Sequence, residues 1–509
     1  MYRSSSPGQL SFSDFYLPFG GNLSGENRWV KLSELLPWEE IETLYADQFS
    51  EGVGAPGKSV RLALGALIIK EKLGLSDRET VEQIRENPYL QYFLGLNEYS
   101  DQAPFDASSL VHFRKRFSED ILSQVNELIV FQEIPEDSLD GETSESDNND
   151  DDSEPPANQG KLALDATCAP ADIRYPTDLN LLNQARELSQ EIFDVLYRPL
   201  RSPERRKPRT YRRKARQDYL NVSKQKRPRR KVMRKAVGKQ LRYLHRNLKH
   251  IETLLEQGAC LSTLSARQYR LLLVIHEVYR QQEEMYRLKI KRINHRIVSL
   301  SQPHIRPIVR GKAGASVEFG AKLNVSYVEG YVFINRLSWD AFHEGEDLIA
   351  QVEGYKQRFG YYPESVHADA AYRTKHHRKW CQERGIRLSG HSTLKMSREE
   401  KKQVKADAGY RNRIEGKFGQ GKRRFSLGRV KTKLAQTSVT AISITCLVMN
   451  LEQLLRQLFC LLFCSLNCLP DLWSMVLMAL GRVLMGIKKL AIRFEERLVY
   501  PVTIYQMTS

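Results

Sequence analysis

Two acidic side chains stand within apolar stretches that have the length and composition of buried strands. Asp165 lies in LALDATCA (residues 162–169), and Asp369 lies in SVHADAAY (residues 365–372). Burying a carboxylate is costly unless it is paired with a cation or binds a metal ion. A cap at a strand end or an arginine partner would explain one such acid. Two acids in strands that we expect to be neighbours favour a metal-binding or catalytic site.

A third acid, Glu415, lies in a basic segment, RNRIEGKFGQGKRR (residues 411–424). In a helix, Arg411, Glu415 and Lys422 would share one face because they are four and seven residues apart. The simplest explanation is an i, i+4 ion pair on a solvated helix, which contributes roughly 0.2–0.5 kcal/mol. The pattern alone therefore leaves a surface ion pair and a functional cluster open.

The same segment alternates small residues with cations. Its glycines are Gly416, Gly419 and Gly421, and the cations around them are Lys417, Lys422, Arg423 and Arg424. Each glycine weakens a helix by roughly 1 kcal/mol relative to alanine. The pattern indicates a backbone that another chain approaches closely, and a phosphodiester chain is the natural candidate because the segment is so basic.

The elements expected around these acids alternate between strand and helix. In order, they are a strand at 162–169, a β-hairpin at 317–339 that turns at Glu329-Gly330, a helix at 346–358, a strand at 365–372, a helix at 376–384, a strand at 386–390 and a basic helical region from about Arg398. This order predicts an α/β domain with a mixed sheet.

A long helical insertion, residues 178–301, is expected between the first strand and the hairpin. Within it, residues 198–250 contain 22 Lys and Arg against two acids, a local charge of +20. The whole chain carries +17, so everything outside this segment sums to −3. A concentrated positive field of this kind is typical of a protein that binds a polyanion.

Short helices joined by tight turns are expected in the first quarter of the chain. One spans residues 59–73, and a capping pattern at Ser76 and Glu79 starts the next. A third begins near Asp106 and is expected to expose three cations, Arg114, Lys115 and Arg116. Two interpretations stay open: a helix-turn-helix-like DNA reader, and a small helical domain with a solvated basic face.

Two further segments bear on location. Residues 136–154 contain ten acids and no Lys or Arg, which predicts a disordered linker. Residues 457–481 contain one charge, Asp471, and are long enough to cross a bilayer. Asn467, Pro470 and Asp471 near the middle favour two buried or partner-facing helices instead, so we expect no membrane span.

The first residues lack a secretory pattern, and the seven cysteines include no Cys-x-x-Cys pair, so a reducing cytoplasm is expected.

These observations divide the chain into six expected parts. They are a flexible N-terminus (1–30), a helical DNA-binding domain (31–134), an acidic disordered linker (135–160), an α/β catalytic domain (161–177 and 302–457), a basic helical insertion (178–301) and an apolar helical tail (458–509).

Taken together, the motifs resemble the cut-and-paste DDE transposases of bacterial insertion sequences, in the group with a Tyr-x2-Arg-x3-Glu-x6-Lys pattern. Arg411, Glu415 and Lys422 match that spacing, whereas the tyrosine position falls on Ala408, with Tyr410 two residues later. The family's second-acid motif, Asp-x-x-Tyr after an apolar strand, appears as residues 369–372, and its first acid corresponds to the one at 165. LSDRETVEQIRENPYLQYFLGL (residues 75–96) also resembles the helical domain that precedes the core in one branch. The similarity covers roughly residues 37–458.

The resemblance implies a ribonuclease-H-like core in which Asp165, Asp369 and Glu415 are both catalytic residues and ligands of two Mg²⁺ ions, for which Mn²⁺ can substitute. It implies DNA cleavage at the element ends and strand transfer of the freed 3′-hydroxyl, by a homodimer on the terminal inverted repeats and target DNA, at the nucleoid. The residues expected to bind DNA are Arg411, Lys422, Lys417, Arg423, Arg424, Arg114, Lys115 and Arg116. Two alternatives remain: a ribonuclease-H-like nuclease without strand transfer, and a catalytically decayed DNA-binding derivative of a transposase.

Overall fold

The computed structural model describes residues 11–18, 20–49, 56–131, 158–202, 206–309, 317–390 and 397–460. The expected acidic linker at 136–154 and nearly all of the apolar stretch at 457–481 lie outside these residues. Residues up to 451 form one compact unit.

The N-terminal part of this unit is built from short helices. They are α1 (Arg28–Glu34), α2 (Trp38–Ala46), α3 (Val60–Leu73), α4 (Asp77–Glu86), α5 (Pro88–Phe93), α6 (Ser109–Arg116) and α7 (Glu119–Phe131). Ser59 caps α3 through the backbone N–H of Leu62, and Gly74 ends it with a φ of +69°. The Ser76 side chain accepts from the N–H of Glu79 at the start of α4. The helices expected at 59–73 and after Ser76 are confirmed, whereas the third begins at Ser109 and not near Asp106. The N-terminus that was expected to be flexible includes Phe15 and Leu23, which are buried in a hydrophobic cluster.

The last of these helices, α7, packs on the sheet that follows it in the sequence. The Asn126 amide donates to the carbonyl of Val332 over 3.2 Å and accepts from Asn450 over 2.8 Å. Glu127 pairs with Arg358 at 2.6 Å. These contacts are buried or partly buried, so α7 contributes directly to the packing of the α/β part.

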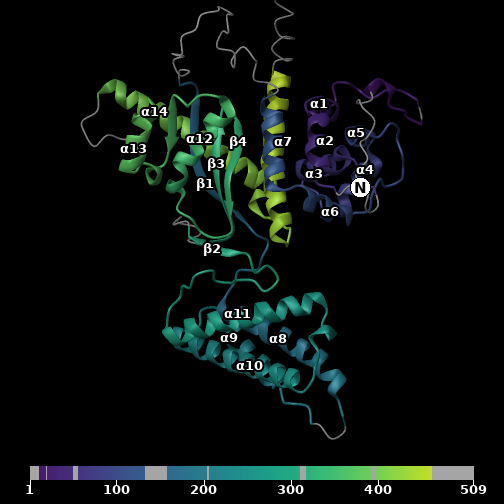
Figure 1. Ribbon diagram of the computed structural model, residues 1–509, viewed down its shortest axis with the longest axis vertical. Coiled ribbons are helices and arrows are strands. Elements are labelled where there is room, and N and C mark those ends of the chain that lie inside the picture. Colours follow the sequence, from purple (N-terminus) through teal and green to yellow (C-terminus); the bar gives the residue numbers. More distant parts are fainter. Residues whose placement is uncertain are drawn as a thin grey trace, which may run out of the picture. The chain divides into compact units, whose positions relative to one another are not determined.

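A mixed sheet forms the centre of the α/β part (Figure 1). Its strands are β1 (Lys161–Pro170), β2 (Arg306–Val309), β3 (Val317–Val328), β4 (Tyr331–Ser338), β5 (Ser365–Ala368) and β6 (Arg387–Leu388). The strand order is β2-β3-β1-β5-β6, and β4 pairs with β3. β1 is antiparallel to β3 and parallel to β5. Glu329 and Gly330 both have positive φ at the turn between β3 and β4, as a tight hairpin turn requires. The expected mixed α/β order is confirmed.

Three helices follow the hairpin and pack on the sheet: α12 (Leu348–Phe359), α13 (Lys375–Gln382) and α14 (Arg398–Arg424). α14 starts with a capping box in which Ser397 and Glu400 satisfy each other's backbone N–H groups. It continues without a break through its glycines. A Cβ at Gly421 would meet Leu427 and Met449 at 3.0 Å, whereas nothing lies within 4 Å of that position at Gly416. Gly421 is therefore needed for close packing within the protein, and the prediction that all three glycines mark a close approach of DNA is wrong for it.

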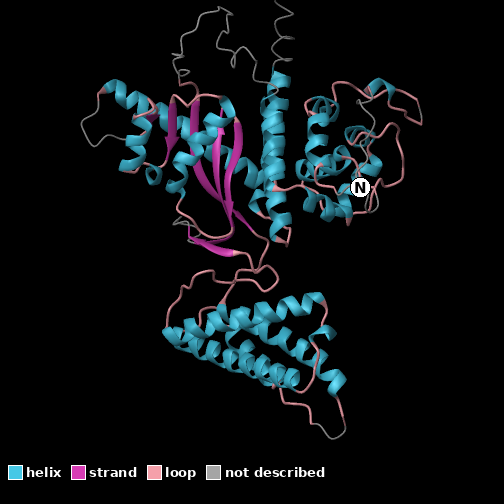
Figure 2. Cartoon of the chain, viewed as in Figure 1, coloured by secondary structure: helices cyan, strands magenta, loops and turns pink. Residues whose placement is uncertain are grey.

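The insertion is helical, as expected, and the strands that the structure describes belong to the sheet of the α/β part (Figure 2). Its helices are α8 (Asp178–Tyr197), α9 (Arg212–Ser223), α10 (Arg230–Glu256) and α11 (Ala266–Leu288). A core of fully buried side chains such as Leu182, Phe193, Leu244 and Ile275 joins α8, α10 and α11. The insertion thus has a hydrophobic core of its own.

Within the described chain, one helix is long and apolar enough to cross a membrane. It spans Ala435–Cys460, and 83% of its most apolar window is buried within the protein. Such burial is typical of a helix that packs on all sides in a protein core.

Candidate active site

The register of β1 and β5 brings two of the acids together. Leu164 of β1 lies opposite Ala368 of the parallel strand β5. Asp165 and Asp369 follow these residues and so lie side by side. The sequence predicted that Asp369 lies inside the strand, but β5 ends at Ala368. The Asp369 carboxylate caps the short 3₁₀-helix η6 (Ala370–Tyr372), because it accepts a hydrogen bond from the N–H of Ala370 over 2.6 Å. The carboxylate thereby escapes burial.

The third acid reaches this place on α14, which covers one face of the sheet. Ala163, Tyr327 and His367 form a row on that face, where the ring of Tyr410 packs on Tyr327 and His367 at centroid distances of 5.7 and 4.9 Å. Asp165 lies two residues beyond Ala163 and shares its face because side chains alternate along a strand. The next turns of α14 therefore carry its side chains over Asp165.

All three acids line one cavity of about 310 Å³. Its lining residues are Asp165, Ala166, Thr167, Cys168, Ile308, Val309, Lys322, Glu344, Asp369, Arg411 and Glu415. The side chains of Asp369 and Glu415 are 57% and 56% exposed, whereas Asp165 lies deeper. The structure thus brings together the three predicted acids and one of the predicted DNA-binding cations, Arg411.

Arg411 stands between two of the carboxylates. Its guanidinium lies 3.3 Å from Asp369 and 3.6 Å from Glu415. A cation therefore already bridges the acid at the end of β5 and the acid on α14. The i, i+4 pair that the sequence suggested exists, but Asp369 extends it into a three-residue cluster.

The electrostatic environment of Asp165 is unusual for an aspartate. Burial, reinforced by the neighbouring charges of Glu415 and Glu344, raises its pKa to about 6, against the opposing effects of the Ala166 N–H and Arg411. The Ala166 N–H donates to its carboxylate over 2.8 Å. A buried acid that is repelled by other acids is stabilised by any cation that enters the cavity.

The acids are not assembled into a finished metal site. In the part of the chain that the structure describes, no three Asp, Glu, His or Cys side chains converge closely enough to hold an ion. Arg411 contributes to keeping the three carboxylates apart, since its guanidinium lies against two of them. The donor set nevertheless fits Mg²⁺, which prefers carboxylate oxygens, and the guanidinium marks where a cation is stabilised.

Sequence reasoning missed two residues of the cavity, Lys322 and Glu344. They form an ion pair of 2.9 Å, and Glu344 belongs to the 3₁₀-helix η5 (Glu344–Asp347). Glu344 is one of several acids between residues 340 and 347, and nothing in their spacing distinguishes it. Only the packing of η5 beside β1 selects it.

Three polar residues near the acids serve structural contacts. Asp407 is buried and binds Arg387 through two hydrogen bonds of 2.7 and 3.0 Å, so it does not line the cavity. The Tyr410 hydroxyl donates to the carbonyl of Lys161, which ties α14 to β1. The Tyr372 hydroxyl donates to Asn324 over 2.6 Å. The family motif has a tyrosine where this chain has Ala408. Tyr410, two residues later, anchors the helix.

The other predicted cations of α14 are distributed differently. Lys422 and Arg424 line a second cavity at the C-terminal end of α14, whereas Lys417 and Arg423 line neither this cavity nor that of the acids. Lys422 does not line the cavity of the acids, so the expectation that it accompanies Arg411 and Glu415 in one site stays a prediction.

The cations of α6 also depart from expectation. Arg114 is 6% exposed and binds Asp77 through two hydrogen bonds of 3.1 and 2.5 Å, so its predicted exposure is wrong. Thr440 donates to the carbonyl of Arg114, and Gln436 donates to that of Lys115. The Arg116 side chain lies over the ring of Phe49, and Lys115 is exposed. A helix covered in this way presents one cation, not three, to a DNA groove.

Two parts of the chain match known families. Residues 366–452 match the family described as "Transposase DDE domain", and residues 19–116 match the family described as "Transposase domain (DUF772)". The first match contains Asp369, Arg411 and Glu415, while Asp165 lies outside both.

A relative from Rhizobium meliloti, described as "Uncharacterized protein ORF8 in nfe locus", is 30% identical over 159 residues. The shared region covers 31% of this chain and 69% of the relative. No solved structure matches the chain.

Proposed function

This chain belongs to the insertion-sequence transposases with a DDE domain, and we propose that it cuts DNA at the ends of its element and joins the freed 3′-hydroxyl to target DNA. The observation that carries the proposal is the convergence of Asp165, Asp369 and Glu415 on one cavity from β1, the end of β5 and α14. DNA is the partner that a transposase requires. A homodimer on the paired element ends, at the nucleoid, is part of the same proposal.

The fold that we propose for the α/β part is ribonuclease-H-like. In its support, the path β4-β3-β1-β5-β6 starts with two antiparallel pairs and ends with two parallel ones. The three acids extend from the central strand, its parallel neighbour and a helix that covers both. We assign the chain to the Tyr-Arg-Glu-Lys subgroup on the spacing of Arg411, Glu415 and Lys422 within one continuous helix.

We propose that Asp165, Asp369 and Glu415 hold two Mg²⁺ ions, with Mn²⁺ as a substitute. Hard carboxylate oxygens, the raised pKa of Asp165 and the cation that bridges the other two acids support this fit. When bound, such ions would supply positive charge that stabilises the attacking and leaving oxygens of a phosphoryl displacement. The remaining contributions come from the protein's own side chains.

Arg411 is the side chain best placed to contact the scissile phosphate. It lines the cavity, and its planar guanidinium suits bidentate contacts to phosphate oxygens. Lys322, paired with Glu344, adds a second cation to the lining of the same cavity. Neither Arg411 nor Lys322 is suited to proton transfer, so both act by binding and orienting phosphates.

The other parts of the chain receive distinct roles in the proposal. The helical domain would read the element ends, with Lys115 and its neighbours near the DNA, and the insertion would contact phosphates through residues 198–250. Most of the cations there are exposed. Phosphate contacts position DNA without specifying its sequence. Lys417 and Arg423 of α14 would extend the same backbone contact.

The test uses the full-length protein, duplex DNA with its terminal repeat, a target plasmid and Mg²⁺. We expect cleaved ends and joined products from the wild type, and neither from Asp165→Asn, Asp369→Asn or Glu415→Gln. Duplex binding should remain within a factor of about three, because affinity rests mainly on phosphate contacts elsewhere. Glu399→Gln, an exposed acid in the first turn of α14, is the matched control.

The outcomes separate the alternatives. Cleavage without joined products would indicate a nuclease, and DNA binding without cleavage would indicate a decayed transposase. Cleavage that survives in the Glu415→Gln variant would show that the third essential acid lies elsewhere.

A further inference from the structure

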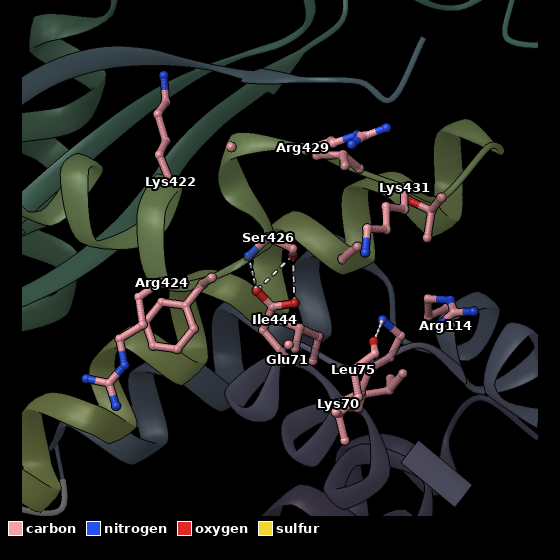
Figure 3. A pocket seen from close by; sticks show the side chains of 17 residues that line it. Lys70, Glu71, Leu75, Arg114, Lys422, Arg424, Ser426, Arg429, Lys431 and Ile444 are labelled. Carbon is pink, nitrogen blue, oxygen red and sulfur yellow. Dashed lines mark hydrogen bonds between the residues drawn. The ribbon is translucent and has the colours of Figure 1, made fainter. Parts of the chain in front are cut away.

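A second cavity, of about 400 Å³, lies where α3 and α6 meet the segment that follows α14 (Figure 3). Six cations contribute to its lining: Lys70, Arg114, Lys422, Arg424, Arg429 and Lys431. They come from three separate stretches of sequence, so only the packing of the helical domain on the end of α14 brings them together. The one acid in the lining is Glu71.

Glu71 offsets only one of these positive charges, and its carboxylate is held on the wall of the cavity by hydrogen bonds. It accepts hydrogen bonds from the backbone N–H and hydroxyl of Ser426, and another from the hydroxyl of Thr445 at 2.8 Å. Figure 3 shows the contact between Glu71 and Ser426 on one side of the cavity. These contacts fix the wall of the cavity. Outside the lining, Asp77 pairs with both Lys70 and Arg114, and Asp172 pairs with Arg429.

One cation, Arg114, is buried and another, Lys70, is half-buried, and both share the single carboxylate of Asp77. Arg114 binds Asp77 through its terminal nitrogens, while its buried Nε has no hydrogen-bond partner among the described residues. Lys70 donates to the carbonyl of Leu75. Burial lowers the pKa of Lys70. The nearby positive charges of Arg114 and Lys431 lower it further, whereas the negative charge of Asp77 raises it. An anion in this cavity would relieve the mutual repulsion.

Lys431 supplies the accessible cation of the group. It is exposed, and it makes no ion pair or hydrogen bond with the residues that the structure describes. In Figure 3 its ammonium group points into the same space as Lys70 and Arg114, whereas the Arg424 side chain extends away from that space. A ligand that enters from solvent would therefore meet Lys431 first.

We propose that this cavity binds a backbone phosphate of the DNA on which the active site acts. This proposal rests on the proposed function. It also specifies where the DNA duplex runs after it leaves the cavity of the three acids. Lys422 and Arg424 lie seven and nine residues after Glu415, about 10–14 Å further along the helix axis at 1.5 Å per residue. That distance matches about three to four base pairs at 3.4 Å each. One duplex can therefore reach both cavities along α14.

The phosphate site also has a structural consequence. Its walls belong to the helical domain and to the segment after the catalytic helix, so a bound phosphate would join the two by contacts to both. DNA binding would then stabilise the position of α3 and α6 against the end of α14.

The experiment measures duplex binding by the full-length protein without divalent metal, so that cleavage does not interfere. Lys431→Gln is compared with Lys402→Gln, an exposed lysine of α14 that lines neither cavity. Both variants lose one charge. We expect Lys431→Gln to weaken binding about threefold or more and to reduce the slope of log K against log salt by about 0.9, the value for one phosphate contact. Lys402→Gln should match the wild type.

A second arm locates the phosphate. Duplexes carry a single neutral methylphosphonate at successive positions from the cleavage site. A methylphosphonate near the third or fourth base pair should weaken DNA binding by the wild type. The same duplex should bind Lys431→Gln no more weakly than the unmodified duplex does. Free inorganic phosphate at millimolar concentration should not compete if the site requires a DNA backbone; full competition would indicate a site for a small anion.

Equal affinities and salt slopes for Lys431→Gln and the wild type would overturn the phosphate site. That result could accompany normal cleavage, in which case the proposed function stands. Conversely, an effect of Lys431→Gln in a protein that never cleaves DNA would remove the proposed function and leave the phosphate site.

Discussion

Arg411 and Asp369 form an ion pair of 3.3 Å between α14 and the end of β5. The two residues are 42 positions apart in the sequence, and the same guanidinium also lies 3.6 Å from Glu415. A positive charge thus holds together two of the three proposed metal ligands. In the absence of metal, this arrangement keeps their negative charges from repelling each other.

The bridging role of Arg411 predicts competition with metal. Arg411→Gln should bind Mg²⁺ about fivefold more tightly in calorimetry without DNA, because an ion pair of this exposure is worth up to about 1 kcal/mol. Cleavage by the same variant should nevertheless fall at least tenfold, since a phosphate contact is lost. Arg413→Gln, an exposed neighbour on α14, is the control. An unchanged metal affinity would argue against the bridge.

The pKa of Asp165, raised to about 6, predicts a pH-dependent metal requirement. A carboxylate must lose its proton to bind a metal ion. Below pH 6 the proton competes, so the half-saturating Mg²⁺ concentration for cleavage should rise about tenfold per pH unit, while it should be constant above pH 7. Measurements at pH 5, 6 and 7.5 test this. A half-saturating concentration that does not change with pH would contradict it.

Asp407 should matter for stability rather than for chemistry. Its carboxylate is buried against Arg387 and lies outside the cavity of the acids. Asp407→Asn should lower the free energy of unfolding by about 1–3 kcal/mol, with the partial exposure of Arg387 limiting the loss. Urea unfolding measures the change. Cleavage should persist above a few per cent of wild type at low temperature, and its complete loss in a folded variant would make Asp407 a ligand.

His367 predicts how stability changes with pH. Burial lowers the pKa of its imidazole, opposed by Asp407. As the pH falls below the usual value of about 6.5, the unfolded chain therefore takes up a proton that the folded chain does not. Stability should decrease from pH 7 towards pH 5, by at most about 1.4 kcal/mol per pH unit for this group. His367→Gln should flatten the dependence in chemical unfolding at several pH values; an identical slope would assign it to other groups.

The insertion should supply much of the salt-dependent DNA affinity. If about a third of its 22 cations contact phosphates, the contribution to the slope of log K against log salt is near −6, at about −0.9 per contact. Deletion is a poor test because α9 and α10 pack with α8. Neutralising the exposed cations between α9 and α10, in Lys226→Gln/Arg227→Gln/Arg229→Gln, should reduce the slope by up to about 2.7. The matched control is Lys401→Gln/Lys402→Gln/Lys405→Gln on α14, and equal slopes for both triple variants would mean that this loop does not contact DNA.

Local signals in the sequence predicted most of the order of elements, but not the short strand β2 (Arg306–Val309), whose place depends on pairing with β3. The alternation of apolar and polar residues over 317–339 predicts two strands, and Glu329-Gly330 predicts the turn between them. Both signals lie within a few residues, so the sequence alone predicts the hairpin. The helix that begins after Ser59 and ends at Gly74 is set by its caps in the same way. The acids were recognisable since a carboxylate in an apolar strand is costly wherever the strand lies.

Long-range packing decided which side chains meet. By itself, the sequence determined the strands and helices, the charge of the insertion and the three acids, because periodicity, capping and burial cost are properties of short segments. Only the tertiary structure placed Glu344 and Lys322 in one cavity with Asp165 and buried Arg114 against Asp77. Each of these depends on contacts between residues far apart in the chain, and the spacing of residues within one segment carries no information about which distant segment will cover it.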